Sequence, residues 1–356
     1  MRKKRSRLIT ALSLLLCLAL VLSSCQAPQQ PPEEPDLPEE VTVVDDDYDY
    51  DEAPDTEEYA PARPGHTDFL WEVIGGVGRV YLMGTMHLVS NDYILTPELL
   101  DIFDEMDALA LEVDMLDFAA LRDLMDLYFF PEGETILDHL SERGQAHLLN
   151  MVEAYGMELE SILTTRPFAL SSSFMVAALE QSDFNAIVGG VDLLLNLRAW
   201  EQDMPVYVLE DARAVLTSMN NLPADSQERI MVLTIPPPEQ MVEEVLNLYE
   251  MFLSGDYYLI LEFLMAESEE EEYFLGGDGL PIEFLEIDEL YHYYLLEHRD
   301  RIMADNIIAY LESGENVFVA AGLAHFLGEN SIIYFLEQAG YQVVRVDLRE
   351  RAAQAV

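Results

Sequence analysis

Two stretches far apart in the chain follow one pattern, and together they decide the fold. Residues Val80–His87 read VYLMGTMH, an apolar run of strand-forming residues that stops at Gly84 and places a histidine three residues later. Residues Val317–His325 read VFVAAGLAH and repeat the pattern around Gly322. Continuous apolar runs of this length are typical of strands buried on both faces of a parallel sheet. A histidine just past the carboxyl end of such a strand lies in the crevice where open α/β sheets bind ligands.

The rest of the chain predicts an α/β fold with a central sheet flanked by helices. Phe69–Ile74 and Arg79–Met83 flank a Gly75-Gly76 turn, which predicts a β-hairpin. Thr96 and Pro97 are typical of the N-cap and first residue of a helix. Further strands are expected over Ala108–Leu111, Val206–Leu209 and Tyr341–Val346, with a large helical insertion over Asp117–Gln181 and other helices from an Asp192 N-cap to Trp200, from Pro236, over Leu290–Leu311 and between His325 and Gly340.

Polar side chains come directly after four of the predicted strands. These residues are His87, Glu112, Glu210 and His325, with Asp114 two positions beyond Glu112. If the strands are parallel neighbours, one edge of the sheet gathers two imidazoles and two or three carboxylates. Two imidazoles and a carboxylate with open positions suit zinc, manganese or cobalt with a bound water, and a second carboxylate is then available as a general base.

Short motifs spread along the chain support this arrangement. They are Leu70-Trp71, Tyr81–His87, Leu111–Asp114, Gly190–Asp192, Pro205-Val206, Leu209-Glu210, Arg299–Met303, Ala321–Gly328 and Gly340–Val343. In this order they resemble the TraB/GumN family, which includes PrgY and the animal Tiki proteins. The resemblance covers most of the globular part and implies an α/β fold of the erythromycin-esterase/ChaN-like kind. Asp300 departs from the asparagine of many members and adds a negative charge near the expected site.

The resemblance also implies an activity, because the animal members are proposed metal-dependent proteases that need the two histidines and a glutamate. Those roles fall on His87, Glu112 and His325, which we expect to hold a divalent metal (Mn, Co or Zn), with Glu210 and Arg299 as catalytic residues. The expected substrate is a peptide. Two alternatives stay open: a lipoprotein without catalysis that sequesters a peptide signal, a metal or haem, and a structural domain whose site is inactive.

The amino terminus predicts export and a lipid anchor. A basic segment, Arg2–Arg7, precedes a predominantly apolar segment of 15 residues, Leu8–Leu22, which is too short to span a membrane comfortably. Leu22–Cys25 reads LSSC and resembles a bacterial lipobox, so residues 1–24 are expected to be a signal peptide and Cys25 to be acylated on the extracytoplasmic face of the cell membrane. Residues 25–66 are rich in proline and acid and predict a disordered tether. Residues 67–356 form the expected domain.

Composition excludes several chemistries. The cysteines are Cys17 and Cys25 and the lysines are Lys3 and Lys4, so the expected mature protein has no free thiol and no lysine. Catalytic cysteine, thiolate zinc ligation, Schiff-base chemistry and a Walker lysine are therefore excluded. Five of the 18 basic residues, and none of the 68 acidic ones, precede Cys25, so the mature charge is more negative than the −50 of the whole chain. Such a surface repels nucleic acid and has no electrostatic attraction to anionic lipid, which leaves the acyl anchor as the expected membrane link.

Overall fold

The fold is built on a mostly parallel six-stranded sheet. The computed structural model describes residues 69–265 and 296–348, and its central sheet has the strand order β6-β4-β7-β2-β1-β8. Strands β2, β7, β4 and β6 pair in parallel, whereas β1 is antiparallel to β2 and β8 is antiparallel to β1. The strands are β1 (Leu70–Ile74), β2 (Val80–Thr85), β4 (Ala108–Leu111), β6 (Val206–Val208), β7 (Val317–Gly322) and β8 (Gln342–Arg345). The predicted α/β class is confirmed.

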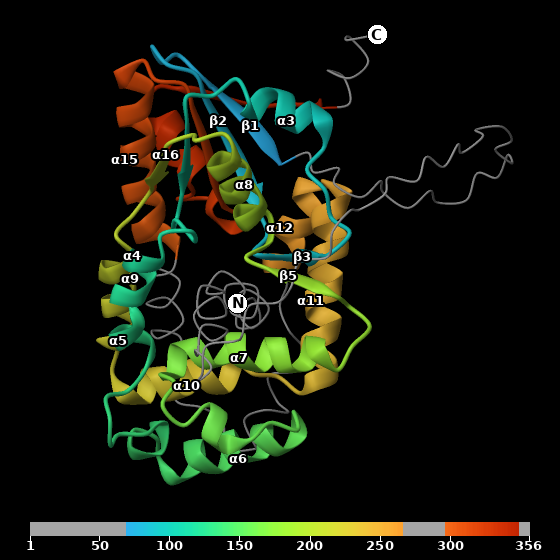
Figure 1. Ribbon diagram of the computed structural model, residues 1–356, viewed down its shortest axis with the longest axis vertical. Helices are drawn as coiled ribbons and strands as arrows, with labels where there is room; N and C mark the ends of the chain where they lie inside the picture. Colours follow the sequence, from blue (N-terminus) through green and yellow to red (C-terminus); the bar gives the residue numbers. More distant parts are fainter. Residues whose placement is uncertain (1–68, 266–295, 349–356) are drawn as a thin grey trace, which may run out of the picture.

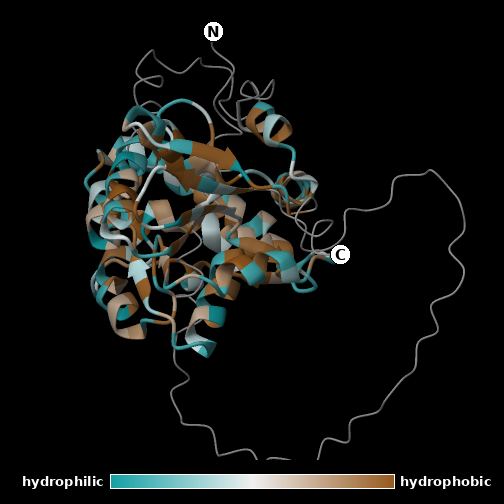
Figure 2. Ribbon diagram, turned by 90° about the horizontal axis from the view of Figure 1, so that it is seen from above, coloured by the Kyte–Doolittle hydropathy of each residue, from teal (hydrophilic) through white to brown (hydrophobic). Residues whose placement is uncertain are grey.

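Three neighbouring strands, β2, β4 and β7, lie at the centre of the hydrophobic core. Every residue of β2, β4 and β7 is buried, as expected for parallel strands covered on both faces. Figure 2 shows predominantly hydrophobic strands beside helices of mixed character. Gly84 leaves room for the chain that follows β7, because a Cβ at this position would lie 2.5 Å from Cδ1 of Leu323.

Helices cover the two faces in an order that follows from handedness. Connections between parallel strands are right-handed, so helices on strands added in opposite directions lie on opposite faces. The chain moves from β2 to β4 to β6 through α3 and α8, and then returns to β7 and β8 through α15 and α16. Figure 1 accordingly shows α3 and α8 on one side of the sheet and α15 and α16 on the other. The bounds are α3 (Pro97–Phe103), α8 (Gly190–Glu201), α15 (His298–Ser313) and α16 (Ile332–Gln338).

A helical layer lies beyond the carboxyl edge of the sheet (Figure 1). It has two hydrophobic clusters of its own, distinct from the cluster around the sheet. A small two-stranded sheet, β3 (Leu88–Ser90) with β5 (Ala186–Val188), joins this layer to the end of β2. The remaining helices are α4 (Phe118–Asp123), α5 (Met125–Tyr128), η1 (Ile136–Asp138), α6 (Glu142–Ala154), η2 (Leu159–Ser161), α7 (Pro167–Glu180), α9 (Ala212–Asn220), α10 (Ala224–Thr234), α11 (Pro238–Ser254), α12 (Tyr257–Met265) and η4 (Leu323–Phe326).

Most sequence expectations for local structure are confirmed, and one assignment is wrong. The β1–β2 hairpin forms, the Thr96 hydroxyl accepts from the backbone of Leu99 at the start of α3, and α4 to α7 form the helical insertion. Asp192, however, is not an N-cap, because α8 starts at Gly190 and Asp192 lies in its first turn. The sequence also predicts an acidic loop over Glu267–Glu272, which lies outside the described residues. None of the described helices is both long and apolar enough to cross a membrane.

Candidate functional site

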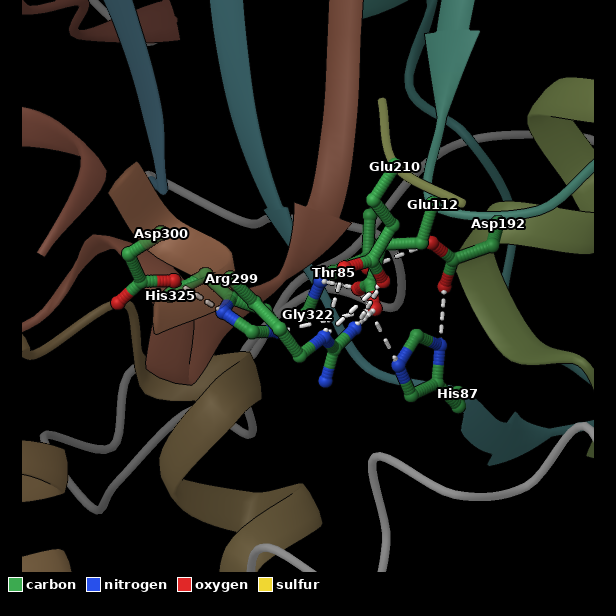
Figure 3. Close-up of polar contacts among 9 residues, drawn as sticks. All are labelled: Thr85, His87, Glu112, Asp192, Glu210, Arg299, Asp300, Gly322 and His325. Carbon is green, nitrogen blue, oxygen red and sulfur yellow. Dashed lines mark hydrogen bonds and ion pairs between the residues drawn. The ribbon is translucent and has the colours of Figure 1, made fainter. Parts of the chain in front are cut away.

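The carboxyl ends of four parallel strands meet in one polar cluster, as the sequence predicts. His87 follows β2, Glu112 follows β4, Glu210 follows β6, and His325 lies in η4 directly after β7. Arg299 enters the same cluster from α15. Figure 3 shows these side chains converging below the strand ends. We call the following nine residues the site cluster: Thr85, His87, Glu112, Asp192, Glu210, Arg299, Asp300, Gly322 and His325.

Glu112 is the centre of the site cluster. Its Oε1 accepts a hydrogen bond from the backbone N–H of Gly322 at 2.7 Å, and its Oε2 accepts from Nη2 of Arg299. The two imidazoles face the same carboxylate, since Nε2 of His87 lies 3.7 Å from Oε1 and Nε2 of His325 lies 3.6 Å from Oε2. The carboxyl group therefore links β4 to both histidines and to β7.

The two histidines are held in the same way. Nδ1 of His87 lies 2.8 Å from Oδ2 of Asp192, and Nδ1 of His325 is hydrogen-bonded to Oδ1 of Asp300. The Nε2 atom of each ring is buried and, within the described part of the chain, has no hydrogen-bond partner. Buried polar atoms normally have a hydrogen bond, so two ring nitrogens that reach only ion-pair distance from one carboxylate are candidates for holding a ligand.

Arg299 and Glu210 form a buried ion pair beside this centre. Nε of Arg299 donates to both carboxylate oxygens of Glu210, at 3.0 and 2.9 Å, and Nη2 donates to Oε1 as well. Both side chains are buried. Because both oxygens of Glu210 accept from the guanidinium, Glu210 holds Arg299 in place next to Glu112.

The charges of the site cluster favour additional positive charge. The site cluster contains four carboxyl groups (Glu112, Asp192, Glu210 and Asp300) and one guanidinium, that of Arg299. This imbalance acts on the imidazoles, which can take up protons, and it would equally favour a bound cation.

The pKa shifts in the site cluster reflect the same excess of carboxyl groups. Burial alone would lower the pKa of the His325 imidazole, but the charges of Asp300 and Glu112 raise it to about 9. Burial likewise opposes the rise in the pKa of His87, which the Asp192 carboxylate brings about. Burial alone would raise the pKa of the Glu112 carboxyl, but the positive charges of His325 and Arg299 hold this pKa well below the usual range. Burial raises the pKa of the Asp300 carboxyl to about 6.

The residues fit a divalent cation in kind, and two of their pairwise separations are compatible with shared ligation. Two metal–ligand bonds of about 2.1 Å that meet at 110–120° hold their donor atoms about 3.4–3.6 Å apart, and the two imidazole–carboxylate separations are 3.7 and 3.6 Å. As the side chains stand, however, no three His, Cys, Asp or Glu groups of the described residues are arranged to hold an ion. In this arrangement the Glu112 oxygens accept from Arg299 and Gly322.

A close approach of backbones brings Asp192 to His87. Gly190 has φ +52°, and a Cβ at this position would lie 1.9 Å from the carbonyl oxygen of Met86. The backbone N–H of Val191 donates to that same oxygen at 3.1 Å. The first turn of α8 therefore rests directly on the backbone that carries His87, which requires glycine at this position.

Sequence reasoning found five members of the cluster and missed others. The side chains of Thr85, Asp192 and Asp300 were not expected in it, and Asp300 was noted only for its charge. Asp114 does not join the cluster, because its carboxylate caps the backbone N–H of Leu116 at 3.0 Å. The pair Gly189-Gly190 shortly before Asp192 is a sequence signal for close backbone packing. Nothing in the sequence, however, says which element the glycines pack against. Cys25 lies outside the described residues.

The fold and the cluster define a class: an α/β protein whose parallel strands deliver two histidines, a glutamate and an arginine to one carboxyl edge. The topology places this edge where the strand order reverses, between β4, β7 and β2, which is the usual ligand position in open α/β sheets. The chain belongs to the TraB/PrgY/gumN family, whose model matches residues 69–345. No curated protein sequence and no solved structure matches the chain significantly.

Proposed function

We propose that this protein is a lipid-anchored, extracytoplasmic hydrolase that depends on a divalent metal and acts on peptides. The observation that carries the proposal is the pair of buried, unpaired Nε2 atoms of His87 and His325, which face the carboxylate of Glu112 at 3.7 and 3.6 Å. Two imidazoles and one carboxylate are a common ligand set of hydrolytic zinc and manganese sites. Such an ion, when bound, lowers the pKa of its water and polarises a carbonyl group.

The excess of carboxylates supports a cation in the cluster. A divalent ion would offset most of the negative charge that Arg299 leaves uncompensated, and it would do so without protons on the imidazoles. Metal ligands must be deprotonated, so binding should release protons that the imidazoles otherwise hold. For Glu112 to serve as a ligand, one of its oxygens must face the ion while the other keeps its bond to Gly322 or Arg299.

Arg299 and Glu210 have a shared role in this proposal. The guanidinium lies beside Glu112. From there its positive charge would stabilise a carbonyl oxygen that gains negative charge during attack by water. Glu210 accepts from Arg299 through both oxygens, which favours holding the arginine over acting as the general base, because a base would first have to release it.

Membrane attachment is the part of the proposal that rests on sequence alone. The LSSC motif supports acylation at Cys25, and the acidic segment that follows supports a tether between the membrane and the family domain. A peptide in the extracytoplasmic space is the substrate class that this location makes accessible.

The test compares histidine variants with a matched control. Purified protein lacking residues 1–25 is loaded with zinc or manganese, its metal content is measured, and cleavage of a peptide library is followed by mass spectrometry. His87→Ala and His325→Ala should lose the metal and the cleavage, whereas His139→Ala, which removes an exposed imidazole paired with Glu134, should keep both. Circular dichroism checks that each variant is folded.

Two results would contradict the proposal. If both site variants hold metal with the wild-type stoichiometry, the assigned ligands are wrong. If the wild type binds metal but cleaves no peptide in the library, the protein is a binding lipoprotein and the hydrolase assignment fails.

A further inference from the structure

Each histidine of the site cluster contacts a carboxylate, and the two carboxylates come from helices on opposite faces of the sheet. Asp192, on α8, meets Nδ1 of His87, and Asp300, on α15, is hydrogen-bonded to Nδ1 of His325. These two helices lie on opposite sides of the sheet (Figure 1). Both carboxylates are buried, at 4% and 2% exposure, so neither contact is a surface ion pair that water competes for.

A third residue orients one of these carboxylates. The hydroxyl of Thr85 donates to Oδ1 of Asp192 at 2.9 Å, while Oδ2 of the same carboxylate faces His87 (Figure 3). Thr85 is the last residue of β2, the strand that leads to His87. The strand therefore sets both the position of the imidazole and the orientation of the group that holds it.

We propose that Asp192 and Asp300 are positioning residues that hold the neutral rings of His87 and His325 in the tautomer whose Nε2 carries no proton and faces Glu112, and that Thr85 keeps Asp192 in the orientation this requires. The part that concerns metal affinity rests on the proposed function. The part that concerns the tautomer does not, because it follows from hydrogen bonds within the protein.

The physical reason is the complementary nature of the two ring nitrogens. A neutral imidazole carries one N–H, and the nitrogen that donates a hydrogen bond decides which nitrogen keeps the lone pair. A carboxylate at Nδ1 accepts from N–H there, so Nε2 is left as the acceptor or ligand. Carboxylates placed behind ligating histidines orient the ring and increase its basicity, and their removal typically weakens metal binding by about 10–100-fold.

The two contacts also explain why the Nε2 atoms stay unpaired. A ring rotated by half a turn would place carbon atoms opposite the carboxylates and lose the Nδ1 contacts, at a buried position where water cannot replace them. The geometry thus selects one ring orientation for each histidine before any ligand arrives. Preorganisation of this kind is what a site needs to bind an ion without first rearranging.

The first experiment measures the affinity of the protein for zinc by competition with a chelating dye. The protein used lacks only residues 1–24, the expected signal peptide. We expect Asp192→Asn and Asp300→Asn to weaken binding by about 10–100-fold. Thr85→Val, which removes the hydroxyl and keeps the shape, should weaken it by a smaller factor, and Thr85→Ser should restore it. Asp104→Asn is the matched control, because Asp104 pairs with Arg198 at the surface.

The second experiment reads the tautomer directly and does not need the metal. Proton–nitrogen correlation spectra of ¹⁵N-histidine-labelled, metal-free protein are recorded at alkaline pH, where the rings are neutral. We expect His87 and His325 to carry the proton on Nδ1, unlike a histidine free in water, which favours Nε2–H. Asp192→Ala should shift His87 toward the Nε2–H form and leave His325 unchanged, and Thr85→Val should shift His87 in the same direction.

The outcomes separate this inference from the proposed function. The positioning role would be overturned by protons on Nε2 in the wild type. It would also be overturned if the wild type binds zinc and the Asp192, Asp300 and Thr85 variants bind it with the same affinity as the Asp104 control. A wild type that shows both Nδ1–H rings but binds no zinc would leave the positioning role standing and overturn the metal proposal. Thr85→Val keeps the test decisive if the aspartate variants fail to fold.

Discussion

Replacing Arg299 by methionine tests whether the site cluster depends on its one guanidinium. The side chain is 4% exposed and donates to both oxygens of Glu210 and to Glu112. Methionine fills a similar apolar volume but supplies no charge and no donor, so two buried carboxylates lose their cation. Removing one partner of a buried ion pair costs about 3–5 kcal/mol, because the other charge is left without compensation. We expect Arg299→Met to lower the free energy of unfolding by this amount.

Urea unfolding followed by circular dichroism, with chelator present to remove metal, measures the loss as a shift in midpoint at constant slope. Arg198→Met is the control: Arg198 pairs with Asp104 across 2.6 Å, but their side chains are 34% and 37% exposed. Exposed pairs contribute about 0–1 kcal/mol.

A double variant checks the assigned cause. Adding Glu210→Gln removes one of the two uncompensated charges, so Arg299→Met with Glu210→Gln should be more stable than Arg299→Met alone. Neighbouring groups of this kind couple by about 0.5–3 kcal/mol. The reasoning is refuted if Arg299→Met costs no more than Arg198→Met, or if the second change makes the protein less stable still.

Three further predictions concern separate parts of the protein. Gly190→Ala should destabilise the fold and weaken zinc binding, because its Cβ would lie 1.9 Å from the carbonyl oxygen of Met86 at φ +52°; unchanged thermal unfolding would contradict this. Burial alone would lower the pKa of His325, but neighbouring carboxylates raise it to about 9, so the folded state binds this proton more tightly than the unfolded chain. The resulting stability of the metal-free protein should be complete below about pH 6.5 and lost as pH rises through 9, as denaturation at a series of pH values can show. Cys25→Ser should release the protein from the membrane fraction of fractionated cells if the cysteine is acylated, while membrane retention would point to another anchor.

The sequence determined the strands and the residues at their ends. The continuous apolar runs before Gly84 and Gly322 need to be buried on both faces of a sheet. This need for burial on both faces predicts central parallel strands. The side chains that follow such strands share one edge of the sheet, which is why His87, Glu112 and His325 were predictable as a group. The predicted signal peptide and lipidation site are equally local, since each is a run of consecutive residues, and they stay predictions.

Only the tertiary structure decided which carboxylates contact the Nδ1 atoms of the two histidines. Asp192 was expected to cap a helix, yet it lies inside the first turn of α8 and turns its carboxylate to Thr85 and His87. Asp300 was expected only as a nearby charge, yet it is hydrogen-bonded to His325. The physical reason is that strand ends are placed by the regular ladder of the sheet, whereas the rotation and depth of a covering helix depend on how its side chains pack. That packing is a property of the whole core, and no short stretch of sequence encodes it.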